Sequence, residues 1–150
     1  FVGDTVRQHA AVNLGFACDT ARGLMVPVLH GAESMGLAEM AARTRELVGQ
    51  ANGGGLNPDL LSGGTFTVSN LGAFGVTTFT PVINAPQVGI LGVGGIQLRP
   101  VRTEDGIEYR DFMSLSLTLN HMVVDGAPGA RFLQTLTRII ENFKLVCIAG

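Results

Sequence analysis

The most restrictive feature of this sequence is a run of 39 consecutive residues, 60–98, without Asp, Glu, Lys, Arg or His. A membrane-spanning helix would need such a run to be apolar throughout, but Gly, Ser, Thr, Asn, Gln and Pro interrupt it repeatedly. Segments that face water normally carry charge, so we expect this uncharged segment to be buried, partly against other subunits or along a ligand channel. The simpler alternative is that it forms an ordinary protein core.

The composition favours a surface that is covered by something else. Charged residues make up 15% of the 150 residues, against about 25% in an average soluble domain. The net charge of −2 offers no electrostatic basis for binding nucleic acid or an anionic membrane. Two cysteines are too few for a disulfide framework and favour a reducing compartment. The length allows one domain. Because the chain starts with Phe1 rather than Met, we expect it to be a piece of a longer polypeptide.

The spacing of apolar residues predicts an α/β fold with a mixed sheet. Residues 113–120 alternate apolar with polar, as a half-buried strand does. Five apolar residues from Phe132 to Phe143 recur at helical spacing and lie on one face of a helix. We expect strands at 9–18, 24–29, 65–70, 88–98 and 113–120, a hairpin turning at Asp105-Gly106, a helix from an N-cap at Ser34 to about residue 51, and a helix from 125–128 to 143.

His121 is the most informative single residue. It continues the alternation of the 113–119 strand, so it is expected at the strand end on the apolar side. Asp125 follows four residues later, and Gly126 permits a tight backbone turn there. A histidine held at such a junction is well placed to act as a general base. The alternative is a buried neutral histidine that is hydrogen-bonded to a backbone carbonyl.

Other candidate residues carry weaker signals. Ser69 ends the 65–70 strand, where its hydroxyl could donate to an oxyanion, although most strand-end serines are structural. Cys18 lies in an apolar strand and is expected to be a core residue rather than a nucleophile. His9, His30 and His121 do not have the spacing of metal ligands, so no metal site is predicted.

Four blocks of the sequence carry a family resemblance when they are taken together. They are residues 12–28, 64–75, 79–95 and 121–127, and the last, HMVVDGA, contains a His-x-x-x-Asp-Gly motif. In this order and spacing they resemble the catalytic domain of dihydrolipoamide acyltransferases, the core component of 2-oxo acid dehydrogenase complexes. The motif alone would be weak, since chloramphenicol acetyltransferases and peptide-synthetase condensation domains carry related forms. The family usually has Asp before the histidine and Arg after it, where this chain has Asn120 and Met122, which removes the partners of a local salt bridge.

The resemblance implies a two-layer fold like that of chloramphenicol acetyltransferase, a mixed sheet flanked by helices. It implies that residues 1–150 are the C-terminal two-thirds of the catalytic domain, without the domain's N-terminal part and without lipoyl or subunit-binding domains. Part of the substrate site would then lie outside this chain, and the isolated fragment need not be active.

The activity that the resemblance implies is transfer of an acyl group, most simply acetyl, between dihydrolipoamide and coenzyme A. By family analogy His121 is the general base, Ser69 stabilises the oxyanion and Asp125 orients the histidine loop. Positions that match substrate-contacting positions in relatives are Asp19, Val82, Asn84 and Leu91. Coenzyme A and a lipoyl group on a separate domain are the implied substrates, and no metal is implied.

The implied assembly is a homotrimer in which the histidine of one subunit meets the serine of the next. Trimers would associate into a larger hollow core, with the apolar residues 145–148 at a contact between trimers. The implied partners are the decarboxylase and dihydrolipoamide dehydrogenase components of the complex. The expected location is the cytoplasm of a bacterium, or the mitochondrial matrix in a eukaryote. Two alternatives stay open: a chloramphenicol acetyltransferase-like enzyme with a small acceptor, and a structural core subunit without turnover.

Overall fold

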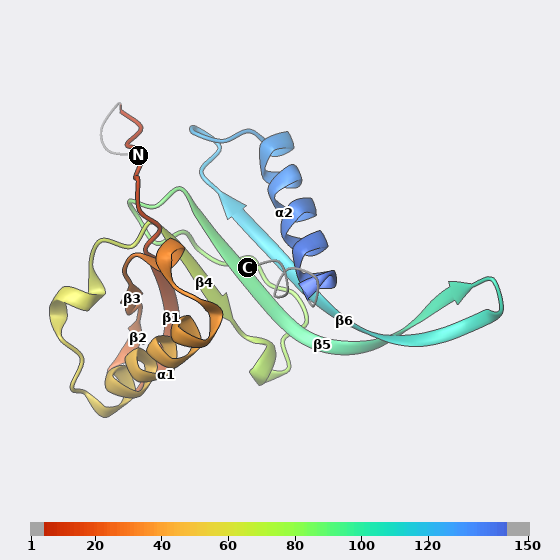
Figure 1. Cartoon of the computed structure of the whole chain (residues 1–150), viewed down its shortest axis with the longest axis horizontal. Coiled ribbons are helices and arrows are strands. Elements are labelled where there is room, and N and C mark those ends of the chain that lie inside the picture. Colours follow the sequence, from red (N-terminus) through yellow and green to blue (C-terminus); the bar gives the residue numbers. More distant parts are fainter. Residues whose placement is uncertain (1–4, 144–150) are drawn as a thin grey trace.

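The computed structural model describes residues 5–143, in which a mixed sheet carries two long helices (Figure 1). The sheet order is β2-β1-β4-β5-β6, with β3 also paired to β1. The predicted α/β class with a mixed sheet is confirmed. The strands are β1 (Leu14–Thr20), β2 (Gly23–Met25), β3 (Val28–Leu29), β4 (Phe66–Asn70), β5 (Gly89–Thr103) and β6 (Gly106–Leu119); the helices are α1 (Leu37–Gly53) and α2 (Gly126–Glu141); short 3-10 turns lie at Ala32–Ser34, Pro58–Leu61 and Gly72–Phe74.

The connections explain why the sheet is mixed. β4 pairs in parallel with both β1 and β5, and parallel neighbours need long crossovers. α1 lies in the first crossover, and residues 71–88 form the second. β5 and β6 are antiparallel and turn at Glu104 and Asp105, one residue earlier than predicted. Gly106 closes this turn with a φ of 134°, a conformation that glycine adopts without steric cost.

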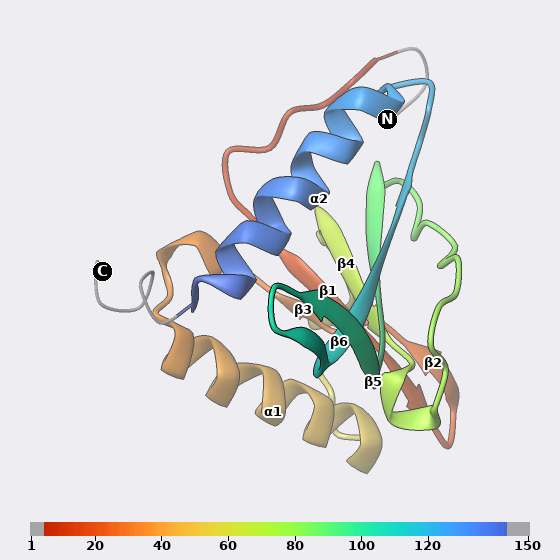
Figure 2. The same ribbon diagram turned by 90° about the vertical axis from the view of Figure 1, so that its right-hand side faces the viewer.

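The two faces of the sheet have different covers (Figure 2). Phe66 in β4 points to the helical face, where its ring centroid lies 6.0 Å from that of Phe132 in α2. Ser69 has the opposite parity and pairs with Gly92 of β5. A Cβ at Gly92 would contact Phe79 and Pro81. Residues 71–88 therefore cover the face that Ser69 shares, while α1 and α2 lie on the other.

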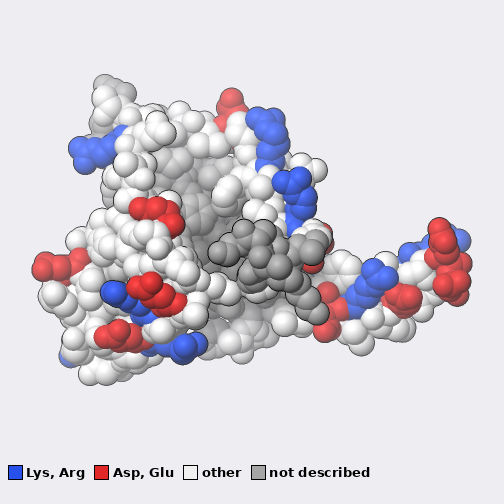
Figure 3. Space-filling view, viewed as in Figure 1, with Lys and Arg blue, Asp and Glu red and all other residues white. Residues whose placement is uncertain are grey.

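The uncharged segment, residues 60–98, contains two kinds of surface. In β4 and the first half of β5 it is buried or half-buried, as predicted, with Thr67 and Ile90 among the most enclosed side chains. The 71–88 crossover is only partly enclosed by this chain, since Gln87 is buried but Phe74 is 70% exposed and Val82 is 87% exposed. Charged side chains gather instead over α1, along α2 and on the β5–β6 hairpin (Figure 3). The expectation that other subunits cover part of this segment stays a prediction.

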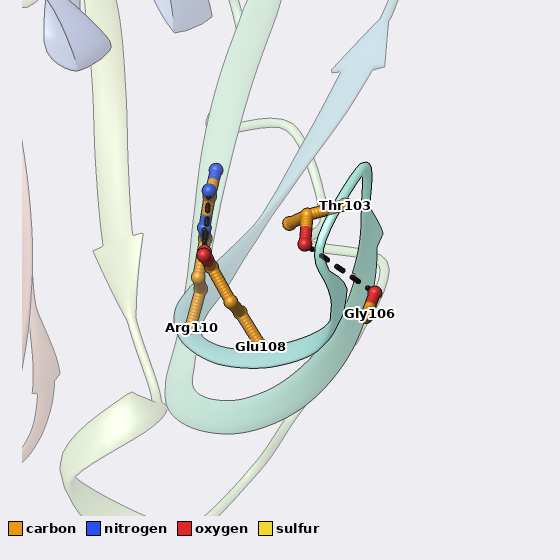
Figure 4. A network of polar contacts seen from close by, with 4 residues as sticks. All are labelled: Thr103, Gly106, Glu108 and Arg110. Atoms are coloured by element: carbon orange, nitrogen blue, oxygen red, sulfur yellow. Dashed lines mark hydrogen bonds and ion pairs between the residues drawn. The ribbon is translucent and has the colours of Figure 1, made fainter.

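The distal parts of β5 and β6 extend away from the sheet as a two-stranded ribbon (Figure 1). The turn is closed by a hydrogen bond in which the Thr103 hydroxyl donates to the Gly106 carbonyl at 3.3 Å. On the same ribbon the Arg110 guanidinium lies 2.7 Å from the Glu108 carboxylate (Figure 4). Apolar side chains on the opposite face of the ribbon are open to solvent, namely Ile96, Leu98, Ile107 and Tyr109, at 65–72% exposure.

Three predicted boundaries in the N-terminal part of the chain are wrong. Ser34 does not cap α1, because it lies in a 3-10 turn in which its hydroxyl donates to the Gly31 carbonyl at 2.8 Å. The N-cap of α1 is Gly36. The predicted 24–29 strand is interrupted around Pro27, so that β2 pairs with the end of β1 and β3 with its start. The predicted 9–18 strand begins later and runs over Leu14–Thr20.

Some predictions concern residues that the structure does not describe. The proposed trimer contact at 145–148, and Cys147 within it, lie outside residues 5–143. Among the helices of the described residues, none combines the length and apolar character that crossing a membrane requires.

Candidate active site

His121 lies in the turn that leads from β6 into α2. Its side chain is 76% exposed, which excludes the alternative of a buried neutral histidine in this chain. Its Nδ1 atom lies 3.8 Å from Oδ1 of Asp125, a distance that allows an ion pair when the imidazole is protonated. The Asp125 side chain is 85% exposed, and solvent weakens a pair of this kind. Asp125 is also the N-cap residue of α2, where a negative charge is favoured by the helix dipole.

A pocket of about 330 Å³ opens between the end of β6 and the first turns of α2. His121 stands at its rim beside Leu117 and Leu119, on the apolar side that the strand alternation predicted. The remaining lining residues come from α2 and the turn before it, namely Val124, Asp125, Gly126, Gly129, Ala130 and Leu133. The imidazole therefore borders a small apolar space and faces solvent at the same time.

Gly129 is a feature of this site that the sequence reasoning missed. It is the one buried residue within α2, and a Cβ there would lie 2.5 Å from Cδ1 of Leu119. The glycine thus lets α2 approach β6 next to the His121 turn. The available signal was its position three residues before Phe132 on the apolar stripe of the helix.

Gly126 does not have the role that the sequence suggested. It is the first residue of α2 and is absent from the glycines with positive φ. A Cβ at this position would meet nothing within 4 Å. The backbone at this junction is therefore open to other residues, and the tight-turn interpretation of Gly126 is wrong for this chain.

Ser69 lies half-buried near the end of β4, between Ala17 of β1 and Gly92 of β5. Among the described residues its hydroxyl makes no hydrogen bond. The hydroxyl can therefore donate to a group that enters from the face covered by residues 71–88.

Ser69 and His121 of one chain lie far apart. Ser69 is in register with Gly92, which is in register with Ser116, and His121 lies five residues beyond Ser116. The separation is about 16 Å along the strands and about 10 Å across them, from about 3.3 Å per residue and 4.8 Å per strand. Their side chains also belong to opposite faces of the sheet. A site that uses both groups therefore needs a second copy of the chain.

The four predicted substrate positions divide between the two faces. Asp19 is exposed in β1 and shares the alternation of Ala17, so it lies on the face of Ser69. Val82 and Asn84 are exposed in the 71–88 crossover that covers this face. Leu91 is 8% exposed and pairs with Val68 and Leu117 on the helical face. The structure thus groups the first three with Ser69 and places Leu91 in the core.

Cys18 is packed as the sequence predicted. It is 8% exposed, and its thiol donates a weak hydrogen bond to the Phe16 carbonyl at 3.3 Å. Burial raises the pKa of this thiol above its ordinary value, because desolvation penalises the thiolate. Within residues 5–143 no group of three or more His, Cys, Asp or Glu side chains could hold a metal ion.

Comparison with known proteins identifies the family. Residues 2–148 match the model of the 2-oxoacid dehydrogenases acyltransferase (catalytic domain) family. The chain is 44% identical over 142 residues to the dihydrolipoyllysine-residue acetyltransferase component of the pyruvate dehydrogenase complex of Corynebacterium glutamicum. It is 39% identical over 142 residues to the corresponding component of the acetoin cleaving system of Bacillus subtilis. These matches cover 91% and 95% of this chain but only 21% and 36% of the two relatives.

Solved structures agree with the sequence comparison. The dihydrolipoamide acetyltransferase of Azotobacter vinelandii superposes with a TM-score of 0.90 at 36% identity, over 96% of this chain and 59% of that one. A truncated catalytic core of the 2-oxoacid dehydrogenase multienzyme complex of Thermoplasma acidophilum superposes with a TM-score of 0.80 at 34% identity, over 92% of this chain and 61% of that one. The predicted resemblance is confirmed in both sequence and fold. This chain belongs to the catalytic-domain family of the 2-oxoacid dehydrogenase acyltransferases.

Proposed function

We propose that this chain carries the acyl-transfer centre of a dihydrolipoamide acetyltransferase, acting between dihydrolipoamide and coenzyme A in a complex of the pyruvate or acetoin type. The observation that carries the proposal is a match of site positions. The Azotobacter acetyltransferase was investigated for the roles of a serine, a histidine and an asparagine in its catalytic mechanism. That serine precedes the histidine by 52 residues, as Ser69 precedes His121. The asparagine follows the histidine by four residues, the position of Asp125 here.

The proposed reaction starts with proton removal from the attacking thiol. A thiol with a pKa of about 8.5 is only a few per cent ionised at pH 7, so a base at the site is useful. His121 accepts the thiol proton as the sulfur attacks the thioester carbonyl. The new carbon–sulfur bond forms while the carbonyl electron pair moves onto oxygen.

The resulting oxyanion needs a hydrogen-bond donor. The Ser69 hydroxyl donates to it in the proposed intermediate. When the carbonyl re-forms, the bond to the leaving sulfur breaks, and His121 returns the proton to that sulfur. Asp125 lies on the turn beside His121 and orients the imidazole in this scheme. Atoms and charges balance without a metal ion or a covalent enzyme intermediate.

The proposed active site is shared between copies of the chain in a homotrimer. Support comes from the separation of Ser69 from His121 along and across the sheet. Further support comes from apolar side chains that this chain leaves open, on the 71–88 crossover and on the β5–β6 ribbon. One solved relative, at 37% identity and a TM-score of 0.90, is the cubic core of the pyruvate dehydrogenase multienzyme complex. We therefore propose association of trimers into a larger hollow core.

The remaining parts of the proposal concern the surroundings of this chain. The chain covers 59% of the solved Azotobacter chain, which supports its assignment to part of a longer catalytic domain, and we propose that this is the C-terminal part. The lipoyl group would be presented by a separate domain. The partners would be the decarboxylase and dihydrolipoamide dehydrogenase components. The cysteine content and the bacterial relatives favour a bacterial cytoplasm.

The proposal is tested by replacing His121 with alanine in the full-length, assembled protein. Acetyl transfer from acetyl-coenzyme A to dihydrolipoamide is measured, with chloramphenicol as a second acceptor. Loss of the base should lower turnover by about 10²- to 10⁴-fold, with assembly preserved in gel filtration. Unchanged transfer in His121→Ala, or transfer to chloramphenicol in place of dihydrolipoamide in the unchanged protein, would contradict the proposal.

A further inference from the structure

We infer that Asn120 is a positioning residue for His121, because its side-chain oxygen fixes the turn that carries the imidazole. This inference rests on the proposed role of His121 as the base. The sequence analysis noted Asn120 only as a replacement that removes one partner of a local salt bridge. The regular hydrogen-bond ladder of β6 stops at Leu119, and Asn120 follows it directly.

Asn120 ties the turn to the sheet. Its backbone N–H donates to the Val88 carbonyl at 2.8 Å, one step beyond the last ladder pair, Gly89 with Leu119. Val88 immediately precedes β5, which lies in the interior of the sheet order. The residue before His121 is therefore held by a central strand, and its backbone cannot shift without breaking that contact.

Asn120 also accepts hydrogen bonds from the three residues that follow His121. Its Oδ1 atom accepts from the Met122 N–H at 3.0 Å. Its backbone carbonyl accepts from the N–H groups of Val123 and Val124, at 3.0 and 3.1 Å. An asparagine side chain that bonds the N–H two residues later forms an Asx turn, a geometry that reproduces a backbone turn. His121 is the residue enclosed between the donor and the acceptor of that turn.

The exposed side chains of the turn offer no comparable constraint. The side chains of His121 and Met122 are mostly exposed, at 76% and 77%, so packing does not fix them. The exposed Asp125 carboxylate at 3.8 Å is a weak restraint. The position from which the imidazole extends is thus set by the backbone at residues 120–124, and the contact with Asp125 acts on the ring from that position. Among the hydrogen bonds that hold the backbone of residues 120–124, the one from the Met122 N–H to Oδ1 of Asn120 is made to a side chain.

The consequence for catalysis is geometric. A displacement of about 1 Å at a reacting group can lower the rate by about 10²-fold. Removing the Oδ1 acceptor frees the Met122 N–H and lets the turn open, which moves His121 relative to the thiol. We therefore expect an effect on kcat with little effect on the KM for coenzyme A, because Asn120 itself contacts no substrate in the proposed site.

The test compares Asn120→Leu, which removes the acceptor, with Asn120→Asp, which keeps an oxygen in its place. Both are made in the full-length, assembled protein, with Met122→Leu as the matched control, since that change keeps the backbone N–H. Asn120→Leu should lower kcat by about 10- to 100-fold at nearly constant KM and melting temperature. Asn120→Asp and Met122→Leu should keep kcat near that of the unchanged protein. Backbone amide exchange at Met122 should accelerate in Asn120→Leu alone.

Two results would overturn the inference. One is an unchanged kcat in Asn120→Leu. The other is an equal loss in the Leu and Asp variants, because the acceptor would then not be the group that matters. The amide-exchange readout separates this inference from the proposed function. If the unchanged protein transfers no acetyl group but Met122 exchange still depends on the Asn120 acceptor, the function fails and the structural assignment of the turn stands.

Discussion

The two helices cover the same face of the sheet but differ in how completely their apolar side chains are buried. α1 lies over a closed core, in which Leu29, Ala32 and Leu47 are between 3% and 8% exposed. α2 is of similar length, 16 residues against 17, yet only Gly129 on it is buried. Three of its large apolar side chains remain exposed, namely Phe132, Ile139 and Ile140, at 42–46%. The region under α1 is closed within one chain, whereas the region around α2 leaves apolar side chains exposed, as the proposed assembly with other chains requires.

This difference bears directly on the proposed site. Ser69 lies in β4, between strands of the closed region, so its position is fixed by one chain. His121 lies at the open end of β6 beside α2, where the single chain leaves it exposed. Changes that disturb packing in the closed region should therefore act on folding, and changes that remove exposed apolar side chains in the open region should act on assembly. Changes to Ser69 or His121 themselves should act on turnover.

A large effect on folding is expected at Gly94 in β5. A Cβ at this buried residue would collide with the Thr77 backbone carbonyl of the 71–88 crossover, and backbone cannot move aside as a side chain can. Gly94→Ala should destabilise the fold by about 1–3 kcal/mol, toward the upper end of that range, measured as the melting temperature and soluble yield. Gly49→Ala in α1 is the control, because nothing lies within 4 Å there and alanine favours a helix by about 0.8–1.0 kcal/mol. Equal behaviour of the two variants would contradict the close packing of the crossover.

Ser69→Ala should act on turnover without acting on folding. Loss of an oxyanion donor costs about 10²- to 10³-fold in kcat, while the half-buried position tolerates a smaller side chain. Steady-state kinetics of the assembled protein, with melting temperature measured in parallel, check this. Full turnover in the variant would remove Ser69 from the mechanism.

Leu47→Ala and Ile139→Ala compare the two helices most directly. Leu47 is 8% exposed and its truncation should cost about 2–5 kcal/mol. Ile139 is 43% exposed in the single chain, so its truncation should change chain stability little and weaken assembly instead. Denaturant unfolding and analytical ultracentrifugation separate the two effects. A large loss of assembly in Leu47→Ala with the fold intact would reverse the assignment of the two regions.

The smallest expected effect concerns Cys18. Burial raises the pKa of its thiol above an ordinary value of about 9, so the folded state holds the proton more tightly than the unfolded chain. This contribution to stability is present below pH 9 and is lost as the pH rises through the raised pKa. At pH 8 iodoacetamide should alkylate Cys18 much more slowly in native than in denatured protein, as mass spectrometry of the peptide would show. Equal alkylation rates would mean that this part of the core opens.

The element boundaries predicted from the sequence were most accurate where the local pattern and the tertiary structure agree. The 65–70 strand and the last helix were placed within about two residues, because their alternation and helical periodicity match the faces that the fold buries. The cap at Ser34 failed because Gly31, with a φ of 67°, starts a separate 3-10 turn before α1. The interruption at Pro27 was missed because pairing with β1 decides it.

The site was predicted by residue type more than by arrangement. His121 lies at the strand end as expected, and the family resemblance pointed to Ser69. The spacing in sequence could not show that these two residues lie on opposite faces, since that follows from the strand order and register. It also could not show that Oδ1 of Asn120 bonds the Met122 N–H, because this bond depends on the turn itself.

The proposed active site joins Ser69 of one chain to His121 of another, and co-assembly of two inactive variants tests this arrangement most directly. Ser69→Ala and His121→Ala chains are co-expressed in equal amounts, and acetyl transfer to dihydrolipoamide is compared with each variant alone. With random mixing at a heterologous interface, about a quarter of the sites would contain both intact groups, so turnover should recover to about that fraction. Turnover that stays at the level of the single variants, in particles shown to contain both chains, would contradict the shared site.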